Sequence, residues 1–353
     1  MKIFYIGHVS PSATTRHRAD ALVRIGHQVT LFDPHQALAD KLNGPVASRL
    51  HYRTGYRLLQ HAALRLLQSQ ATAIRSHDAV WVDSGELFGP DCVKLLTSYC
   101  PRTVLFSPDD PTGGRDGRRF DSLVAALPAY DLCVTMRDPT LADFKRLGAR
   151  RTIKVWRSYD EVQHRPPSND EMVTWPHGGG IAFIGTWMRH ENREDIILAL
   201  LQHGISVSVW GDGWSKSRHW PALRHAWKGA ALYGRDYCRA IAGADACLGF
   251  LSAQNRELHT KRSFEIPYIG GLLVAERTSE HLQVYDEDRH AIFWADAEEC
   301  VNKCLVVLAD PARSHAIRAA GMKRVRELGF GNEALVGTIL TELFRPSDQR
   351  IVA

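Results

Sequence analysis

The sequence lacks the short motifs of several common enzyme classes. It contains no Gly-x-x-x-x-Gly-Lys-Ser/Thr, which excludes a P-loop nucleotidase. The first loop, Gly7-His8-Val9-Ser10-Pro11-Ser12, lacks the Gly-x-Gly-x-x-Gly spacing, which argues against a dinucleotide-dependent dehydrogenase. No Gly-x-Ser-x-Gly nucleophile elbow occurs either. The first loop instead offers Gly7, several hydroxyl groups and a helix amino terminus, which together form a neutral cradle for a phosphate or a sugar.

Membrane-spanning and disulfide patterns are also missing. No apolar run approaches the roughly 20 residues that cross a bilayer, and the stretch from Met1 to Gly7 is too short for the apolar region of a signal peptide. The seven cysteines are an odd number scattered from Cys92 to Cys304, which suits reduced thiols better than a disulfide framework. Cys300 and Cys304 would share a helix face, but no second ligand pair lies nearby, so we predict no metal site there. We therefore expect a cytoplasmic protein.

The length and the charge distribution indicate two domains of unequal character. At 353 residues the chain exceeds what one hydrophobic core usually serves. The formal net charge is +5, and the excess of Lys and Arg lies within residues 1–170. Much of it falls between Arg49 and Arg75, where arginines alternate with Leu and Tyr at helical spacing. Such a helix could rest peripherally on an anionic membrane surface or guide an anionic or lipid-linked acceptor. The alternative is a packed helix whose arginines face water. We expect no nucleic-acid partner.

The first half alternates between strand and helix patterns. Lys2 to Ile6 reads as a buried strand, residues 16–25 as a helix that Gly26 ends, and Gln28 to Asp33 as a second strand. Further strands are predicted at residues 79–83, 103–106, 132–135 and 152–156, with helical patterns between them. This order predicts an α/β domain with a parallel sheet, which we assign to residues 1–168.

The second half repeats this organisation after a break. Residues 166–180 are rich in Pro, Gly and small polar residues and read as a linker. The pattern then restarts, with strands at 181–184, 205–210, 246–250 and 272–274, so a second α/β domain is predicted for residues 178–331. The last amphipathic pattern predicts a helix within residues 332–353. Two such domains would place the carboxyl ends of both sheets across a cleft, where open α/β sheets bind ligands.

The segment from Glu257 to Val274 carries the most informative chemistry. Glu257 and Glu265 lie eight positions apart and flank the pair Lys261-Arg262. Carboxylates accept hydrogen bonds from sugar and ribose hydroxyls, and Lys and Arg neutralise phosphate. The segment therefore holds the groups that a nucleotide sugar requires. A solvated helix face, with Glu and Arg one turn apart, is the structural alternative.

Several stretches of the chain share their pattern with one known family. They are Lys261-Arg262-Ser263-Phe264-Glu265-Ile266-Pro267, Gly270-Gly271-Leu272-Leu273-Val274, residues 295–299, residues 319–325, and in the first half residues 18–27, 106–111, 128–131 and 147–149. With them the chain resembles the CgeB-like (spore maturation protein) glycosyltransferases, relatives of glycosyltransferase family 4. The resemblance implies a GT-B fold, in which two Rossmann-like domains face a central cleft. It further implies that the first domain binds the acceptor, the second binds the sugar nucleotide, and the final helix crosses back toward the first domain.

The resemblance also implies roles for individual carboxylates and cations. It assigns Glu265 to the ribose of the nucleotide and Glu257 to the transferred sugar, as in the Glu-x7-Glu motif of family 4. Such enzymes place a cation on the diphosphate, because the leaving nucleoside diphosphate gains negative charge as the glycosidic bond breaks. The candidates for this cation and for the surrounding donor-binding loops are Arg193, Arg189, Lys261, Arg262, Gly185, Thr186 and Gly7.

Two groups of adjacent acidic residues need separate interpretation. Asp109 and Asp110 follow a predicted strand of the first domain, so they could orient an acceptor hydroxyl or accept its proton. The alternative for this pair is to cap the turn before Pro111. Asp286-Glu287-Asp288 matches the Asp-x-Asp pattern that binds metal in another glycosyltransferase fold, but it lies in a polar stretch that reads as a solvated turn. GT-B enzymes generally use cationic side chains and helix termini, so we predict neither a metal nor another cofactor.

The sequence thus predicts a metal-independent GT-B glycosyltransferase. It would move a sugar from a nucleoside diphosphate, with UDP favoured, to an acceptor hydroxyl that the sequence does not identify. Kinship with family 4 implies that the configuration at the sugar is retained. A sugar-nucleotide binding protein without transferase activity and a GT-B nucleotide-sugar epimerase are the alternatives.

Overall fold

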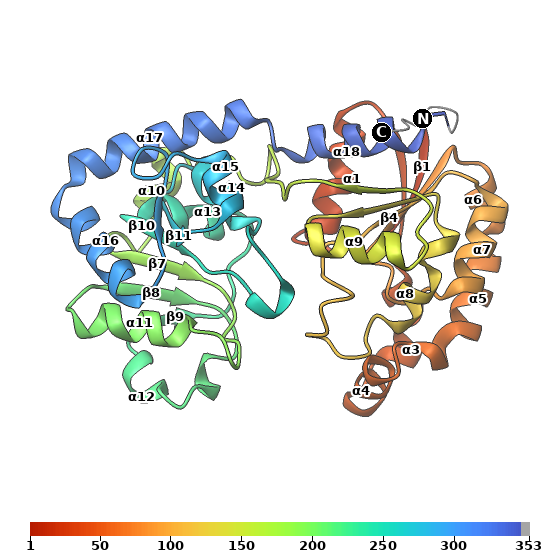
Figure 1. The fold of residues 1–353 in the computed structure, drawn as a ribbon, viewed down its shortest axis with the longest axis horizontal. Coiled ribbons are helices and arrows are strands. Elements are labelled where there is room, and N and C mark those ends of the chain that lie inside the picture. Colours follow the sequence, from red (N-terminus) through yellow and green to blue (C-terminus); the bar gives the residue numbers. More distant parts are fainter. Residues whose placement is uncertain (347–353) are drawn as a thin grey trace. The chain divides into compact units, whose positions relative to one another are not determined.

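In the computed structural model, which describes residues 1–346, the chain divides into two compact units. The first unit comprises residues 1–156, the short segment Gln254–Arg256 and the described residues from Asn332 onward. The second unit comprises Arg157–Ala253 and Glu257–Gly331. Each unit is built on one six-stranded sheet (Figure 1). Residues 347–353, the end of the segment predicted to carry the final helix, lie outside the described residues.

The sheet of the first unit is parallel, with strand order β2-β1-β3-β4-β5-β6. Successive side chains of a strand point to opposite faces, so each central strand contributes to two cores. Phe4 and Ile6 enter the core on one face, and Ile3 and Tyr5 enter the core on the other. The strands are β1 (Lys2–Ile6), β2 (Gln28–Phe32), β3 (Ala79–Asp83), β4 (Thr103–Phe106), β5 (Leu132–Thr135) and β6 (Thr152–Lys154).

Helices cover both faces of this sheet (Figure 1). The last described helix packs on α1, where Leu335, Val336 and Ile339 join Leu22 in one core. The helices of the unit are α1 (Thr14–Arg24), α2 (Pro34–Ala37), α3 (Ala39–Leu42), α4 (Pro45–Arg53), the 3-10 helix η1 (Arg57–Leu59), α5 (Gln60–Ser69), α6 (Ala71–Arg75), α7 (Pro90–Tyr99), α8 (Asp121–Ala126), η2 (Leu127–Ala129), α9 (Asp138–Arg146) and α18 (Asn332–Leu343).

The basic stretch from Arg49 to Arg75 differs from the single helix that its spacing suggests. It is divided among α4, η1, α5 and α6, and the break between α4 and η1 lies at Gly55 and Tyr56, whose φ angles are +59° and +56°. A Cβ atom on Gly55 would lie 2.4 Å from the carbonyl oxygen of Arg118, so this turn requires glycine. Helical periodicity continues through the break, which is why the sequence did not reveal it. Among the described residues, no helix is long and apolar enough to cross a membrane.

The second unit repeats the architecture with strand order β12-β11-β10-β7-β8-β9, again all parallel. Two parallel α/β sheets were predicted, and this is confirmed. The edge strands β9 and β12 were not predicted, because three residues are too few to show a period. The strands are β7 (Ile181–Ile184), β8 (Val207–Trp210), β9 (Trp227–Gly229), β10 (Ala246–Gly249), β11 (Leu273–Glu276) and β12 (Ile292–Trp294).

The helices of the second unit follow the same alternation. The helix that carries Glu265 is α14, and it ends at Gly270, whose φ of +98° is the left-handed geometry that favours glycine after a helix. The helices are α10 (Asn169–Val173), α11 (Arg193–Gln202), η3 (Trp214–Lys216), α12 (Trp220–Leu223), α13 (Gly234–Gly243), α14 (Arg262–Ile269), α15 (Ser279–Val284), α16 (Ala297–Ala309) and α17 (Pro311–Leu328), and the 3-10 helix η4 (Ala253–Asn255) follows β10.

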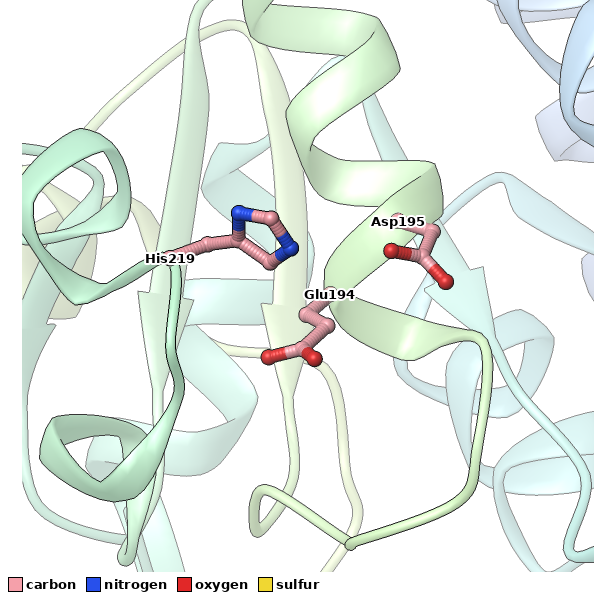
Figure 2. A group of neighbouring side chains, drawn as sticks. All are labelled: Glu194, Asp195 and His219. Atoms are coloured by element: carbon pink, nitrogen blue, oxygen red, sulfur yellow. The ribbon is translucent and has the colours of Figure 1, made fainter.

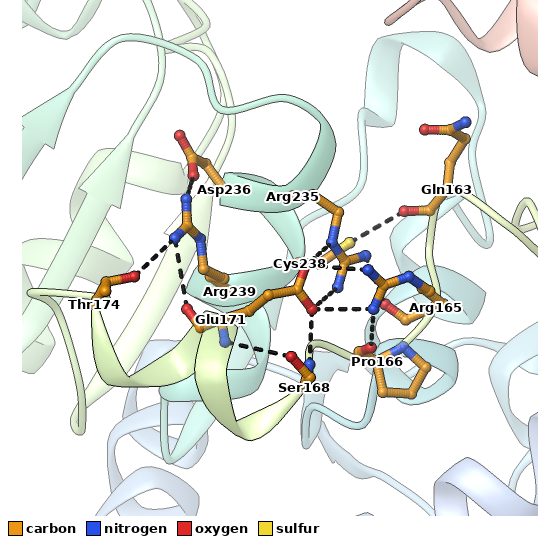
Figure 3. A network of polar contacts seen from close by, with 10 residues as sticks. All are labelled: Gln163, Arg165, Pro166, Ser168, Glu171, Thr174, Arg235, Asp236, Cys238 and Arg239. Carbon is orange, nitrogen blue, oxygen red and sulfur yellow. Dashed lines mark hydrogen bonds and ion pairs between the residues drawn. The ribbon is translucent and has the colours of Figure 1, made fainter.

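The stretch read as a linker is an ordered part of the second unit. It contains α10, which begins with a capping box between Ser168 and Glu171. Figure 3 shows that the Glu171 carboxylate accepts hydrogen bonds from Arg165 and from Arg235 of α13 at 2.7–3.1 Å. These hydrogen bonds lower the pKa of Glu171. Composition alone suggested flexibility, whereas paired charges hold α10 on α13.

Replacing Glu171 tests this attachment. Glu171→Gln keeps the size of the side chain but removes the charge that both arginines share, so α10 should detach more often. We expect subtilisin to cut within residues 166–180 several-fold faster than in the wild type, and high salt to reduce the difference because exposed ion pairs are screened. Asp170→Asn, an exposed neighbour on the same helix, is the control. Equal cleavage rates in the two variants would contradict the attachment.

Candidate functional site

The predicted residues of the second unit gather at the carboxyl ends of its central strands. Gly185 and Thr186 follow β7 directly, and Glu257 lies in the loop after β10. Arg193 begins α11 and Arg262 begins α14. Parallel α/β sheets bind ligands at this edge, because the loops there carry backbone and side-chain groups that the sheet does not use.

The loops after β7 and β8 approach each other closely at the floor of this site. A Cβ atom on Gly211, whose φ is +144°, would lie 2.1 Å from the carbonyl oxygen of Gly185. A Cβ atom on Gly185 would lie 2.5 Å from the Phe183 ring. Neither position accepts a side chain, so the backbone itself lines the site here.

Two arginines of the site are prepared to receive an anion. Arg193 is only 14% exposed, and its Nη1 donates to the Thr186 carbonyl at 2.9 Å. Burial, with the positive charge of Arg262, lowers the pKa of Arg193 even though Glu191 lies 2.6 Å from its Nε. The Nε of Arg262 is buried without a hydrogen-bond partner among the described residues. A buried guanidinium with unused donors favours a ligand carboxylate or phosphate.

Three carboxylates lie around Arg193, and the sequence singled out only one of them. Glu257 accepts a hydrogen bond from the Ser252 amide at 3.1 Å and lies 3.7 Å from Arg157. Glu276 ends β11 and accepts from the Leu251 amide at 2.8 Å. Burial and the nearby charges of Glu191 and Glu257 raise the pKa of Glu276. A terminal strand position could have indicated Glu276, whereas nothing in the pattern distinguished Glu191.

Glu265 is the most deeply buried charge of the site. Its side chain is 1% exposed, and its Oε2 accepts from the Tyr237 hydroxyl at 2.6 Å. Its Oε1 lies 3.6 Å from both Lys261 Nζ and His164 Nε2. Burial opposes ionisation, but the charge of Lys261, the nearby His164 ring and the Tyr237 hydrogen bond outweigh it and lower the pKa of Glu265 to about 2. His164 Nδ1 accepts from the Asp160 amide, so its Nε2 carries a proton toward Glu265.

Lys261 and Arg189 differ in their surroundings. Lys261 is one helical turn from Glu265 and remains 40% exposed, so it can face both this carboxylate and a ligand. Arg189 is exposed in the loop after β7. Arg193, Arg262, Glu191, Glu257 and Glu276 form a charged cluster. Of the two arginines that follow β7, Arg193 therefore lies in this cluster and Arg189 lies at the surface.

The remaining predicted residues lie in the first unit. Gly7 follows β1 directly, and a Cβ atom there would lie 2.4 Å from Thr15 at the start of α1. A cavity of about 80 Å³ adjoins it and is lined by polar groups that include His8, Ser84 and Glu86. Glu86 is buried, and hydrogen bonding to His35 and the charge of Arg119 overcome this burial and lower its pKa to about 2. The sequence indicated none of these cavity residues except Gly7.

Asp109 and Asp110 are adjacent in sequence but differ in exposure. Asp109 is 36% exposed and lies 3.8 Å from Arg119. Asp110 is buried, and its carboxylate accepts hydrogen bonds from Thr112, Thr140 and Arg256, with the Arg256 contacts at 2.6 and 2.8 Å. These bonds lower the pKa of Asp110 against the effect of burial. The available lone pairs of Asp110 are therefore used within the first unit.

The turn Asp286-Glu287-Asp288 is only partly the solvated turn that was expected. Asp286 is 65% exposed, but Glu287 is 23% exposed and binds Arg277, and Asp288 binds Lys303. Glu287 and Asp288 are thus engaged in ion pairs that join this turn to Arg277, which follows β11, and to Lys303 of α16; Arg277 also pairs with Glu299 of α16.

One cluster in the described chain has the composition of a metal site. Glu194 and Asp195 of α11 approach His219, with one ligand atom of each within 4.8 Å of the others (Figure 2). Glu194 already accepts from Trp187 and Ser217, and His219 Nε2 accepts from Arg218 at 2.8 Å. These contacts join the loops around α11, and we assign no metal to them.

A cavity of about 470 Å³ lies among β12, α16 and α17, away from the elements that carry the charged cluster. Its floor is apolar, formed by Ile292, Val307 and Ile317. Among the acidic groups that line it, Asp296 caps α16 and Glu299 binds Arg277, whereas Glu298 is exposed. The cavity has the size of a ligand site; of the two cations that line it, Lys303 binds Glu287 and Asp288, whereas Arg313 is exposed.

Comparison with known proteins identifies the class of fold and domain. Residues 189–339 match the family described as glycosyl transferase-like. No curated protein matches the chain at a significant level. The predicted glycosyltransferase domain is thus confirmed for this part of the chain, which contains Arg193, Glu257 and Glu265.

Solved structures share the fold over the whole chain at low identity. Anabaena HepE, in complex with UDP and glucose, has a TM-score of 0.67 at 11% identity and covers 97% of this chain and 100% of its own. Sucrose-phosphate synthase of Thermosynechococcus elongatus has a TM-score of 0.70 at 15% identity, with coverages of 98% and 99%. A UDP-forming trehalose-phosphate synthase of Burkholderia xenovorans has a TM-score of 0.63 at 14% identity, with coverages of 97% and 100%. The predicted GT-B fold is therefore confirmed.

The buried charge of Glu265 predicts a pH-dependent stability. The native pKa of about 2 lies below the ordinary value of 4.5, so ionised Glu265 stabilises the fold above about pH 4.5. This contribution is lost as the pH falls from there toward 2. We expect Glu265→Gln to lower the free energy of unfolding by about 3 kcal/mol near neutral pH and by progressively less below pH 4.5.

Urea unfolding of both proteins over this pH range measures the difference. Glu298→Gln, an exposed position on α16, is the control and should behave like the wild type. A gap between wild type and Glu265→Gln that stays constant with pH would contradict the assignment.

Proposed function

We propose that the chain transfers a sugar from a nucleoside-diphosphate sugar, with UDP as the favoured nucleotide, to an acceptor hydroxyl. The observation that carries the proposal is the combination of Arg193 and Arg262, which have buried and incompletely used donors, with the buried, ionised Glu265. Cations suit the diphosphate, and a carboxylate suits the ribose hydroxyls. HepE, which shares the fold, is described in complexes with UDP and with UDP-glucose. This supports a UDP-sugar donor for the second unit.

The donor would lie against the loops after β7 and β8 and the start of α14. Gly185 and Thr186 would bring backbone groups close to the diphosphate, while Arg193, Arg262 and Lys261 would neutralise it. As the bond between the anomeric carbon and the diphosphate oxygen breaks, the leaving group takes the electron pair, and these cations stabilise the charge that develops. No bound metal is then required for this step.

Glu265 and Glu257 would hold the two ends of the donor. Glu265 would accept hydrogen bonds from the ribose through Oε1, since its Oε2 is bound to Tyr237. Glu257, nearer to Arg193 and Glu276, would contact the transferred sugar. This division follows the Glu-x7-Glu pattern of family 4, and with that kinship we propose retention of configuration without a covalent carboxylate intermediate.

The first unit would bind the acceptor. Asp109, which is exposed next to Arg119, is the better group to orient a hydroxyl or take its proton, because the oxygens of Asp110 are held by Arg256, Thr112 and Thr140. Gly7, which lies beside the polar cavity of this unit, is proposed instead for donor binding, as the sequence predicted. We also propose that the protein is related to the CgeB-like glycosyltransferases and that it is located in the cytoplasm.

Nucleotide release tests the reaction. Incubation with a panel of UDP-sugars should release UDP, and Glu265→Ala should reduce the release at least 10-fold through the loss of a hydrogen-bonded charge in the site. UDP binding without UDP release from any sugar would instead identify a binding protein. Conversion of the sugar nucleotide without release would identify an epimerase.

Two arginine variants test the phosphate contacts. Arg193→Ala and Arg262→Ala should each weaken UDP binding roughly 10- to 100-fold, because hydrogen bonds to charged groups contribute about 1.5–3 kcal/mol. Arg189→Ala, at an exposed position in the loop that leads to Arg193, is the control and should change binding less than about twofold. Isothermal titration with UDP measures these constants, and equal losses in Arg189→Ala and Arg193→Ala would refute the assignment.

A further inference from the structure

Helix α4 of the first unit is exposed in an unusual way. None of the residues from Pro45 to Arg53 is buried, although helices of globular proteins ordinarily bury one face. Val46 is 78% exposed and Leu50 is 47% exposed. After the turn at Gly55, Leu58 is 62% exposed. Single exposed aliphatic residues are common, but a short segment that presents three of them calls for a partner.

Four exposed side chains of α4 share one face. Val46, Arg49, Leu50 and Arg53 occupy positions i, i+3, i+4 and i+7, which fall on one side of an α-helix at about 100° per residue. Aliphatic and basic side chains therefore alternate on the same surface. This arrangement suits an interface where arginines reach phosphate groups while aliphatic side chains enter an apolar layer.

The charge of this surface is one-sided. The nine residues of α4 include Arg49 and Arg53 and no acidic residue. Arg57 follows after the turn and lies 3.2 Å from Asp121. No ion pair is found for Arg49 or Arg53 among the described residues, so both charges are available to an anionic partner. The segment is also the centre of the basic excess in the first half of the sequence.

We propose that α4 and the turn that follows it dock the chain on an anionic membrane surface. Val46, Leu50 and Leu58 would enter the boundary of the acyl chains, and Arg49 and Arg53 would contact lipid phosphates. The partner is a lipid surface because nucleic acids bind through aromatic stacking and phosphate contacts, which give the exposed Val46 and Leu50 no role. The docking does not depend on the proposed transfer reaction, which requires no membrane.

Vesicle binding by the full-length protein tests the docking. Vesicles of phosphatidylcholine with about 30% phosphatidylglycerol should bind the protein, and vesicles of pure phosphatidylcholine should not, because the attraction is electrostatic in part. Arg49→Gln with Arg53→Gln should lower the partition coefficient roughly 10- to 30-fold. Val46→Asp with Leu50→Asp should lower it by at least about 10-fold. Circular dichroism and the UDP-binding titration confirm that each variant is folded, independently of lipid binding.

Matched control variants make the result specific. Leu282→Asp on α15 is the control for the aspartate variant, because Leu282 is 49% exposed and Leu50 is 47% exposed. Lys145→Gln with Arg150→Gln is the control for the arginine variant, because it removes two exposed charges elsewhere in the first unit. Both controls should bind vesicles like the wild type. Absence of binding to anionic vesicles would overturn the proposal. Unchanged binding of both α4 variants to anionic vesicles would also overturn it. So would a result in which the aspartate variant still binds the vesicles and an RNA homopolymer competes for that binding.

Discussion

The buried negative charge of Glu265 is the constraint on which the organisation of the second unit depends. A carboxylate that is 1% exposed persists in its ionised form only where donors and cations surround it. Here they come from three separate parts of the chain: His164 before α10, Tyr237 of α13 and Lys261 before α14. The hydrogen bonds and ion pairs that stabilise this one carboxylate thus fix the start of α14 relative to α13 and to the segment that precedes α10.

The neighbouring cations are also buried charges that need partners. Arg193 is buried with a lowered pKa, and the Nε of Arg262 has no hydrogen-bond partner in the described chain. Glu191, Glu257 and Glu276 lie around Arg193 but leave the Nε of Arg262 without a partner, and burial together with their mutual repulsion raises the pKa of Glu276. A ligand that brings both phosphate oxygens and hydroxyl groups would satisfy the unused donors and acceptors together. The charge pattern, more than the shape of a cavity, therefore supports the nucleotide-sugar donor that we propose.

Most of the fold could be predicted from the sequence, and part of the site could not. The long buried strands and their α/β order were predicted within two residues, as β1 and β3 illustrate, because apolar runs carry that information locally. The strands β9 and β12 were missed because they contain three residues each. In the site, Glu265 and Arg193 were singled out, but Tyr237, Glu191 and Glu276 were not. Tyr237 and Glu276 lie far in sequence from the charges they neighbour, and Glu191 lies two residues from Arg193 in a polar loop where nothing in the pattern distinguished it.

The sequence by itself determined two parallel α/β units and placed the groups of the Glu257–Glu265 segment at the carboxyl end of the second sheet. It did so because strand order and strand direction follow from local patterns. Only the tertiary structure decided which of these groups are paired. In the structure, Asp110 is hydrogen-bonded to Arg256, and Glu171 holds the segment that was predicted to be a linker. Helix α4 has no buried residue. Such outcomes depend on which distant side chain completes a charge or a core, and no local pattern records that.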